Sequence, residues 1–205
     1  MQNNHNFFYQ TIAQTAIAEF KDRGSKFIAY SFPINNKEDF KKQLNELKKE
    51  HAKAAHFCFA YRLGLHGNDF RVSDDGEPAG SAGKPILNQI DSKQLTNLAV
   101  IVVRYFGGTL LGVPGLINAY KSATTLALQV IPIIQKPIEV IYELQFDYTL
   151  MNEIMQLVKQ LNCSVSKQEI QLFCLMQLGV PKQRIDEMLY RLKNLHSVSV
   201  KKIEL

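Results

Sequence analysis

The feature that most constrains this fold is an almost uninterrupted apolar run, LAVIVVRYF, at residues 98–106. A run so rich in β-branched residues is typical of a strand covered on both faces in the middle of a sheet. It stops at Gly107 and Gly108, and a helix is predicted from Pro114, because proline suits the first turn of a helix. The helix stripe predicted to face the sheet consists of Leu116, Tyr120, Ala123, Ala127 and Val130.

The segments before this run predict further layers of the same domain. Residues 15–20 and 26–34 read as a β-hairpin around a polar turn that contains Gly24. Asn35 or Asn36 is placed to cap a helix that follows. In the strand predicted at residues 56–62, HFCFAYR, the aromatic residues share one face, which is expected to pack inward. The other face carries small residues between His56 and Arg62, so a ligand or a second backbone has room to approach it.

The pattern changes after Pro132 and Pro137. Apolar residues alternate strictly with more polar ones from residue 138 to residue 148, which indicates a sheet with one covered face. Two amphipathic helices and further extended runs follow, in the order β-α-β-β-α-β of a ferredoxin-like domain. The sequence therefore predicts two domains of an α+β protein, residues 1–134 and 135–205.

Composition limits the classes of function. The chain has 205 residues and a net charge of +5, with 15 basic against 11 acidic residues before Gln135 and 9 against 8 from there on. This excess favours an acidic partner for the first domain. Cys58, Cys163 and Cys174 show no CxxC spacing and are expected to be reduced thiols. No apolar run is long enough to cross a membrane and no signal peptide precedes the first strand, so we expect a cytoplasmic protein.

A first glycine-rich segment, VSDDGEPAGSAGKPI at residues 72–86, stands before a predicted helix. The N–H groups at a helix N-terminus carry partial positive charge, so the backbone around Gly83, the Ser81 hydroxyl and Lys84 are candidates to bind a phosphate. The spacing G-x4-G-K-[ST] is absent, which argues against nucleotide hydrolysis. No GxSxG surrounds Ser81, and although His56 could approach it, a serine hydrolase is not expected.

The acidic residues of this segment, Asp74, Asp75 and Glu77, leave three interpretations open. They could ligate a hard metal ion, but the spacing matches no known metal motif, and no metal or cofactor is predicted. They could form a turn, or they could pair internally with Arg62 or Arg104.

A second glycine-rich segment, VRYFGGTLLGVPG at residues 103–115, contains a charge inside an apolar strand. Arg104 must meet a carboxylate, a carbonyl group or a ligand phosphate, because a buried unpaired charge is costly. Gly107, Gly108 and the N-terminus of the following helix offer backbone N–H groups to an anion. A ligand phosphate is therefore as well supported a partner for Arg104 as an internal carboxylate.

Three long segments carry a resemblance: AAHFCFAYR at residues 54–62, SDDGEPAGSAGKPIL at 73–87 and VIVVRYFGGTLLGVPGL at 100–116. They are similar to the IMPACT family, in particular its bacterial YigZ-like branch. The resemblance implies an N-terminal domain like the second domain of a small-subunit ribosomal protein and domain IV of elongation factor G, with a left-handed βαβ unit. It also implies a C-terminal domain like domain V of that factor.

Members of this fold superfamily often contact RNA, and eukaryotic relatives act in translational control. The leading hypothesis is therefore an RNA- or ribosome-binding protein linked to translation regulation, rather than an enzyme. The residues predicted to contact phosphates or bases are His56, Arg62, Ser81, Gly83, Lys84, Arg104, Tyr105, Gly107, Gly108 and Lys121. The alternatives are a hydrolase of a small phosphorylated or peptide substrate, using Asp74, Asp75 and Glu77, and an adaptor for a translation factor. Whether the protein is a monomer or a homodimer stays open.

Overall fold

The computed structural model describes residues 7–65 and 68–203 of the chain. It divides into two units. The N-terminal unit is Tyr9–Lys136, and the C-terminal unit is Pro137–Leu205 together with Met1–Phe8. Each unit has its own sheet and its own hydrophobic core. In the described part of the chain, no helix is long and apolar enough to span a membrane.

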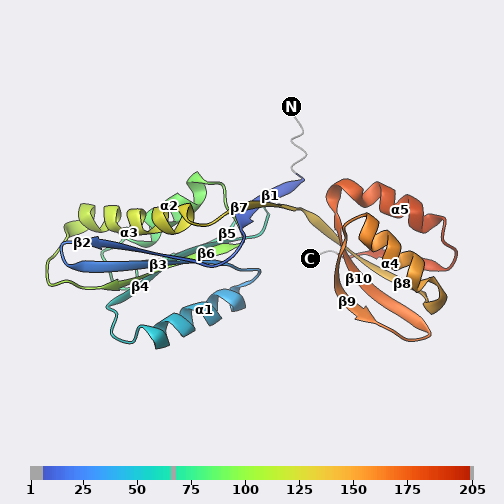
Figure 1. Ribbon diagram of the computed structural model, residues 1–205, viewed down its shortest axis with the longest axis horizontal. Helices are drawn as coiled ribbons and strands as arrows, with labels where there is room; N and C mark the ends of the chain where they lie inside the picture. Colours follow the sequence, from blue (N-terminus) through green and yellow to red (C-terminus); the bar gives the residue numbers. More distant parts are fainter. Residues whose placement is uncertain (1–6, 66–67, 204–205) are drawn as a thin grey trace, which may run out of the picture. The chain divides into compact units, whose positions relative to one another are not determined.

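The N-terminal unit is built on a five-stranded sheet of order β2-β3-β6-β4-β5 (Figure 1). All of its neighbouring strands pair antiparallel, so β3 and β4 run in the same direction on either side of β6. The strands are β2 (Ala16–Asp22), β3 (Ser25–Pro33), β4 (His56–Leu63), β5 (Asp69–Ser73) and β6 (Leu98–Tyr105). The predicted hairpin and the central position of β6 are both present.

Helices cover both faces of this sheet, as the apolar run of β6 requires. Helix α1 (Lys37–Glu50) packs on one face, and α2 (Gly83–Ser92) and α3 (Gly112–Gln129) pack on the other (Figure 1). Along β6, Val100 and Val102 face α2 and α3, whereas Ile101 and Val103 face α1. All four of these side chains are fully buried.

Local signals place the start of α1. The side chain of Asn36 accepts a hydrogen bond from the backbone N–H of Asp39 at 2.8 Å, which satisfies a donor at the end of the helix. In β4, Phe57, Phe59 and Tyr61 belong to the core under α1, as their alternation predicts. The other face of β4 packs against α2, so a second backbone lies over its small residues.

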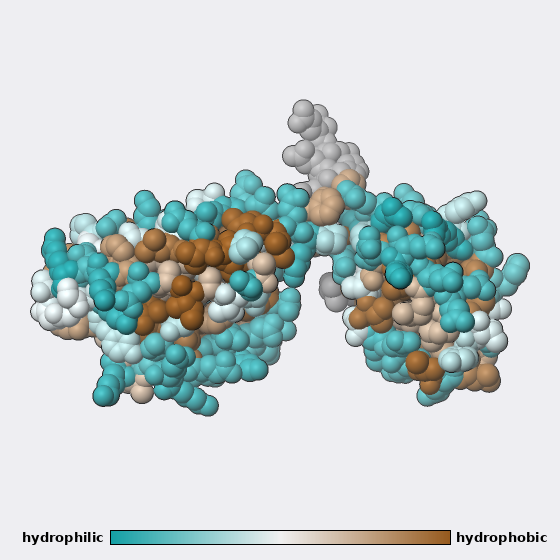
Figure 2. Space-filling model, viewed as in Figure 1, coloured by the Kyte–Doolittle hydropathy of each residue, from teal (hydrophilic) through white to brown (hydrophobic). Residues whose placement is uncertain are grey.

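Other features were not predicted. Strand β1 (Phe8–Ile12) pairs with β7 (Ile133–Pro137), two five-residue strands that are more than 120 residues apart and show no clear alternation. The predicted inward stripe of α3 ends early, because Val130 follows the last turn and is 64% exposed. Figure 2 shows apolar side chains at the surface along α3, where Ile117 and Leu126 are also exposed.

The C-terminal unit has a four-stranded antiparallel sheet of order β11-β8-β10-β9, with α4 and α5 on one side (Figure 1). Its elements are β8 (Glu139–Asp147), α4 (Met151–Gln160), β9 (Ser164–Glu169), β10 (Phe173–Pro181), α5 (Ile185–Lys193) and β11 (Val198–Lys202). Single 3-10 turns, Tyr148–Leu150 and Lys182–Arg184, precede the two helices. This is the predicted β-α-β-β-α-β order, and the α+β architecture is confirmed.

Candidate functional site

In the loop between β5 and α2, the carboxylate of Asp74 takes the place at the helix N-terminus where a phosphate was predicted to bind. The carboxylate of Asp74 accepts hydrogen bonds from the backbone N–H groups of Gly80 and Ala82, each at 2.9 Å, and of Gly83 at 2.8 Å. Burial raises the pKa of Asp74, but these three donors outweigh that effect and lower the pKa below its ordinary value. The N-terminus of α2 is therefore capped from within the chain.

The other predicted phosphate ligands of this loop have different surroundings. Ser81 is fully buried, and its hydroxyl has no hydrogen-bond partner among the described residues. A Cβ atom on Gly83 would lie 2.8 Å from the backbone nitrogen of Ser73, so glycine is needed here for packing of α2 against the end of β5. Lys84 alone among these residues has an exposed side chain.

Asp75 fixes the start of β4. Its carboxylate accepts the backbone N–H of Phe57 at 2.6 Å, and its carbonyl oxygen accepts the Nδ1–H of His56 at 2.8 Å. Asp74 and Asp75 thus have separate structural partners, and they do not converge with Glu77 on one point. No group of potential metal ligands occurs in the described part of the chain. The three acidic side chains are therefore held by different parts of the chain.

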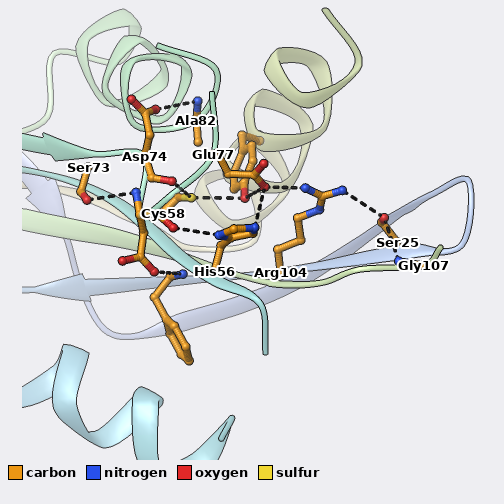
Figure 3. A network of polar contacts seen from close by, with 12 residues as sticks. Ser25, His56, Cys58, Ser73, Asp74, Glu77, Ala82, Arg104 and Gly107 are labelled. Carbon is orange, nitrogen blue, oxygen red and sulfur yellow. Dashed lines mark hydrogen bonds and ion pairs between the residues drawn. The ribbon is translucent and has the colours of Figure 1, made fainter. Parts of the chain in front are cut away.

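Glu77 lies at the centre of a buried polar network (Figure 3). Its Oε1 atom accepts hydrogen bonds from Arg104 Nη1 at 2.6 Å and from the Tyr120 hydroxyl at 2.7 Å. The Sγ atom of Cys58 lies 3.2 Å from the Tyr120 oxygen and 3.0 Å from the Asp74 carbonyl oxygen. Burial raises the pKa of Cys58 and of Tyr120, which keeps both groups protonated.

Arg104 meets this internal carboxylate, which was one of the three kinds of partner predicted for it. The residue is only 5% exposed, and its guanidinium carbon lies 5.4 Å from the ring centre of Phe27 and 5.5 Å from that of Phe106. Its Nη2 atom is 3.4 Å from the Ser25 hydroxyl. Two of its nitrogen atoms, Nη1 and Nη2, are therefore directed towards groups of the chain itself.

Two more predicted ligands lie away from the network. Arg62 is six residues along β4 from His56, a distance of about 20 Å. Its guanidinium pairs with the carboxylate of Asp91 through Nε and Nη2. Tyr105 projects to the α1 side of the sheet, because neighbouring residues of a strand point to opposite faces. Its hydroxyl lies 2.9 Å from His51 Nδ1.

The two glycines after β6 differ from each other. A Cβ atom on Gly107 would come within 1.9 Å of the Gly24 backbone carbon, and the Gly107 N–H donates to the Ser25 hydroxyl at 3.2 Å. Gly107 therefore lets the β2–β3 turn approach closely. Gly108 has a φ of +86°, and a Cβ atom there would meet nothing within 4 Å. Lys121 is exposed on α3.

A pocket of about 330 Å³ lies beside the Glu77–Arg104 pair. Its polar lining consists of His56, Glu77 and Arg104. The rest is apolar and consists of Pro78, Phe106, Leu110, Leu111, Gly112, Val113 and Leu116. The sequence predicts anion contacts from Gly107, Gly108 and the following helix N-terminus, and it does not predict this apolar pocket. The signal for an apolar pocket was present in Phe106 and Leu110, which are apolar residues of the β6–α3 loop, and in Val113 at the start of α3.

Comparison with known proteins identifies the family. The family model described as the Impact N-terminal domain matches residues 23–128. The chain belongs to the IMPACT family. The IMPACT family member of Haemophilus influenzae is 32% identical over 87% of this chain and 87% of its own length. The IMPACT family member YigZ of Escherichia coli is 33% identical over 84% of this chain and 85% of its own length.

Among solved structures, one described as a hypothetical protein covers 97% of this IMPACT family chain and 98% of its own, with 29% identity and a TM-score of 0.78. The likeness therefore extends over both units, including the C-terminal unit that the family model does not match. The predicted resemblance to the YigZ-like branch is confirmed.

Proposed function

We propose that this IMPACT family protein binds RNA, free or within the ribosome, and acts in the regulation of translation. The surface concerned is the outer face of α2 and α3. The observation that carries the proposal is that Lys84 on α2 and Lys121 on α3 are both exposed and stand at the same level of two adjacent helices.

Their relative position follows from one contact between the helices. The Thr125 hydroxyl donates to the side-chain oxygen of Gln89 at 3.0 Å, so these two residues are neighbours across the helix pair. Both helices start near the Asp74–Glu77 loop, since Gly83 contacts Asp74 and Gly112 lines the same pocket as Glu77, and both run in the same direction. Lys121 lies one turn before Thr125 on α3. Pro85, the neighbour of Lys84, lies one turn before Gln89 on α2.

The charge balance supports a polyanionic partner. Residues 9–136 include 16 basic and 11 acidic side chains. Arg62 and Arg104 are compensated by Asp91 and Glu77, so the excess consists mostly of exposed lysines, together with the exposed Arg23 and Arg71. Lysine ammonium groups on a helix pair suit phosphates spaced along an RNA backbone, and they carry no base specificity.

Salt-dependent binding of a labelled single-stranded RNA and of purified ribosomes tests this proposal. Each phosphate contact that is removed should lower the slope of log K against log salt by about 0.7. Lys84→Ala with Lys121→Ala should therefore reduce the slope by about 1.4 and weaken binding. The matched control is Lys48→Ala with Lys49→Ala, which removes the same charge from α1 on the opposite face of the sheet.

Binding that both double variants weaken equally would show that net charge alone attracts RNA, and the proposed surface would be abandoned. Wild-type protein that binds neither RNA nor ribosomes at micromolar concentration in low salt would overturn the function itself.

A further inference from the structure

The pocket beside Glu77 and Arg104 has a mouth made of large apolar side chains. Leu110 is 83% exposed, Phe106 is 51% exposed and Val113 is 45% exposed, and all three line the pocket. Gly108 and Gly112, both with positive φ, bracket the segment that displays Leu110. An apolar rim around a pocket of about 330 Å³ with a few convergent polar groups is the usual form of a ligand site.

The accessible polar group of this pocket is His56, whose side chain is 25% exposed. Its Nδ1 atom must carry the hydrogen, because its partner is the carbonyl oxygen of Asp75, which only accepts. In the neutral ring, Nε2 therefore has a lone pair. Nε2 lies on the side of Glu77, 4.0 Å from Oε1 (Figure 3). The pocket thus presents a hydrogen-bond acceptor.

The charges around the pocket select against ions. Arg104 neutralises Glu77 directly, so the buried pair attracts neither sign strongly. The Nη1 atom of Arg104 donates to Glu77, Nη2 lies towards Ser25, and Nε is buried with no surface open to a ligand. A phosphate or carboxylate would find no open guanidinium donor here. A neutral N–H group next to an apolar group fits best.

A peptide segment has this combination of chemical groups. We propose that the pocket binds an extended segment of a partner protein, with one aliphatic side chain inserted among Phe106, Leu110 and Val113. The backbone N–H of that segment donates to His56 Nε2. An RNA base is the less suitable occupant, because its sugar and phosphate would be drawn against an apolar rim. This protein-binding site is separate from the lysines proposed to bind RNA and does not depend on them.

Three capped tripeptides test the proposal on the intact chain: acetyl-Ala-Leu-Ala-amide, the same peptide with Gly in place of Leu, and the same peptide with Asp. Titrations are followed by amide chemical shifts of residues 106–113 and by the His56 ring resonances. We expect the Leu peptide to bind at least tenfold more tightly than the Gly and Asp peptides, because it alone buries an aliphatic side chain. The His56 ring resonances should shift with the Leu peptide.

Variants separate this site from a general apolar surface. Leu110→Ser should abolish the preference for the Leu peptide, whereas Leu172→Ser, a change at a 74% exposed leucine in the C-terminal unit, should leave it intact. Equal affinity for all three peptides, no shift up to tens of millimolar, or tighter binding of uridine or adenosine monophosphate than of the Leu peptide would each overturn the proposal. Thermal unfolding of both variants shows whether they remain folded, which is expected because both side chains are exposed.

Discussion

The carboxylate of Glu77 and the guanidinium of Arg104 form an ion pair of 2.6 Å in which the two side chains are only 4% and 6% exposed. Removal of one partner leaves the other charge buried and uncompensated, a change that costs about 3–5 kcal/mol. Arg104→Met should therefore lower the free energy of unfolding by about that amount. Urea unfolding monitored by circular dichroism measures the loss.

The matched control for this prediction is Arg62→Met. Arg62 is also on a strand and pairs with a carboxylate, but the side chains of Arg62 and Asp91 are 22% and 37% exposed. Water compensates a partly exposed charge, so this change should cost about 1 kcal/mol or less. Adding Glu77→Gln to Arg104→Met should recover part of the stability, since the unpaired charge is then removed. A double variant that is less stable than Arg104→Met would contradict the explanation.

The spacing of apolar residues along the sequence predicted the strands of both sheets. The apolar run at residues 98–106 predicted a central strand, and the alternation in β4 placed Phe57 and Cys58 on opposite faces of the sheet. The strict alternation around Leu144 likewise predicted the sheet of the C-terminal unit. In each case the side-chain pattern of one segment is sufficient to predict the strand, because that pattern shows whether one face or both faces are buried.

The partners of the polar groups in the site depend on the path of the loops. A loop has no repeating pattern of side chains from which its path can be predicted. Asp74 and Gly83 are nine residues apart, and nothing in their spacing shows that the carboxylate turns back onto the N–H groups predicted to bind phosphate. Arg104 had several carboxylates within reach by sequence, and the fold selects Glu77. The apolar mouth around Leu110 arises in a loop, where neither a helical nor a strand pattern marks a surface.

The cap that Asp74 forms on α2 should make stability depend on pH. Because the folded-state pKa is lowered from 3.8, the ionised carboxylate stabilises the fold above that value. This contribution is lost as the pH falls through the lower, folded-state pKa. Asp74→Ala should reduce the free energy of unfolding by about 1–2 kcal/mol at pH 7. The difference in the free energy of unfolding between the variant and wild type should be smaller at pH 3 than at pH 7. Urea unfolding at pH 7 and at pH 3 measures it. A difference independent of pH would show that the charge of Asp74 does not matter.

The thiols should be slow to react in the native protein. Burial raises the pKa of Cys163 to about 11, so at pH 8 about one molecule in a thousand carries the thiolate that reacts. Alkylation of Cys163 by iodoacetamide should accelerate about tenfold for each pH unit between 8 and 10. Cys58 is fully buried and should react only after unfolding in urea. Mass spectrometry of peptides from native and unfolded samples distinguishes the sites. Native labelling of Cys58 at the unfolded rate would refute its buried position.

The adjacent glycines after β6 allow a comparison of packing with backbone strain. Gly107→Ala would place a Cβ atom 1.9 Å from the Gly24 backbone carbon and 2.2 Å from Ser25 N, so the β2–β3 turn must move. We expect a loss of about 3 kcal/mol or more in the free energy of unfolding.

Gly108→Ala meets no atom within 4 Å and suffers only from its φ of +86°, which costs about 1–2 kcal/mol. Urea unfolding of the two variants should therefore rank Gly107→Ala well below Gly108→Ala in stability. If Gly107 were needed for close approach of a ligand and not of Gly24, the ranking would be lost, because an alanine at either position would then fold with similar stability. The order of the two unfolding midpoints thus decides whether this glycine serves the fold of the β2–β3 turn or a binding surface.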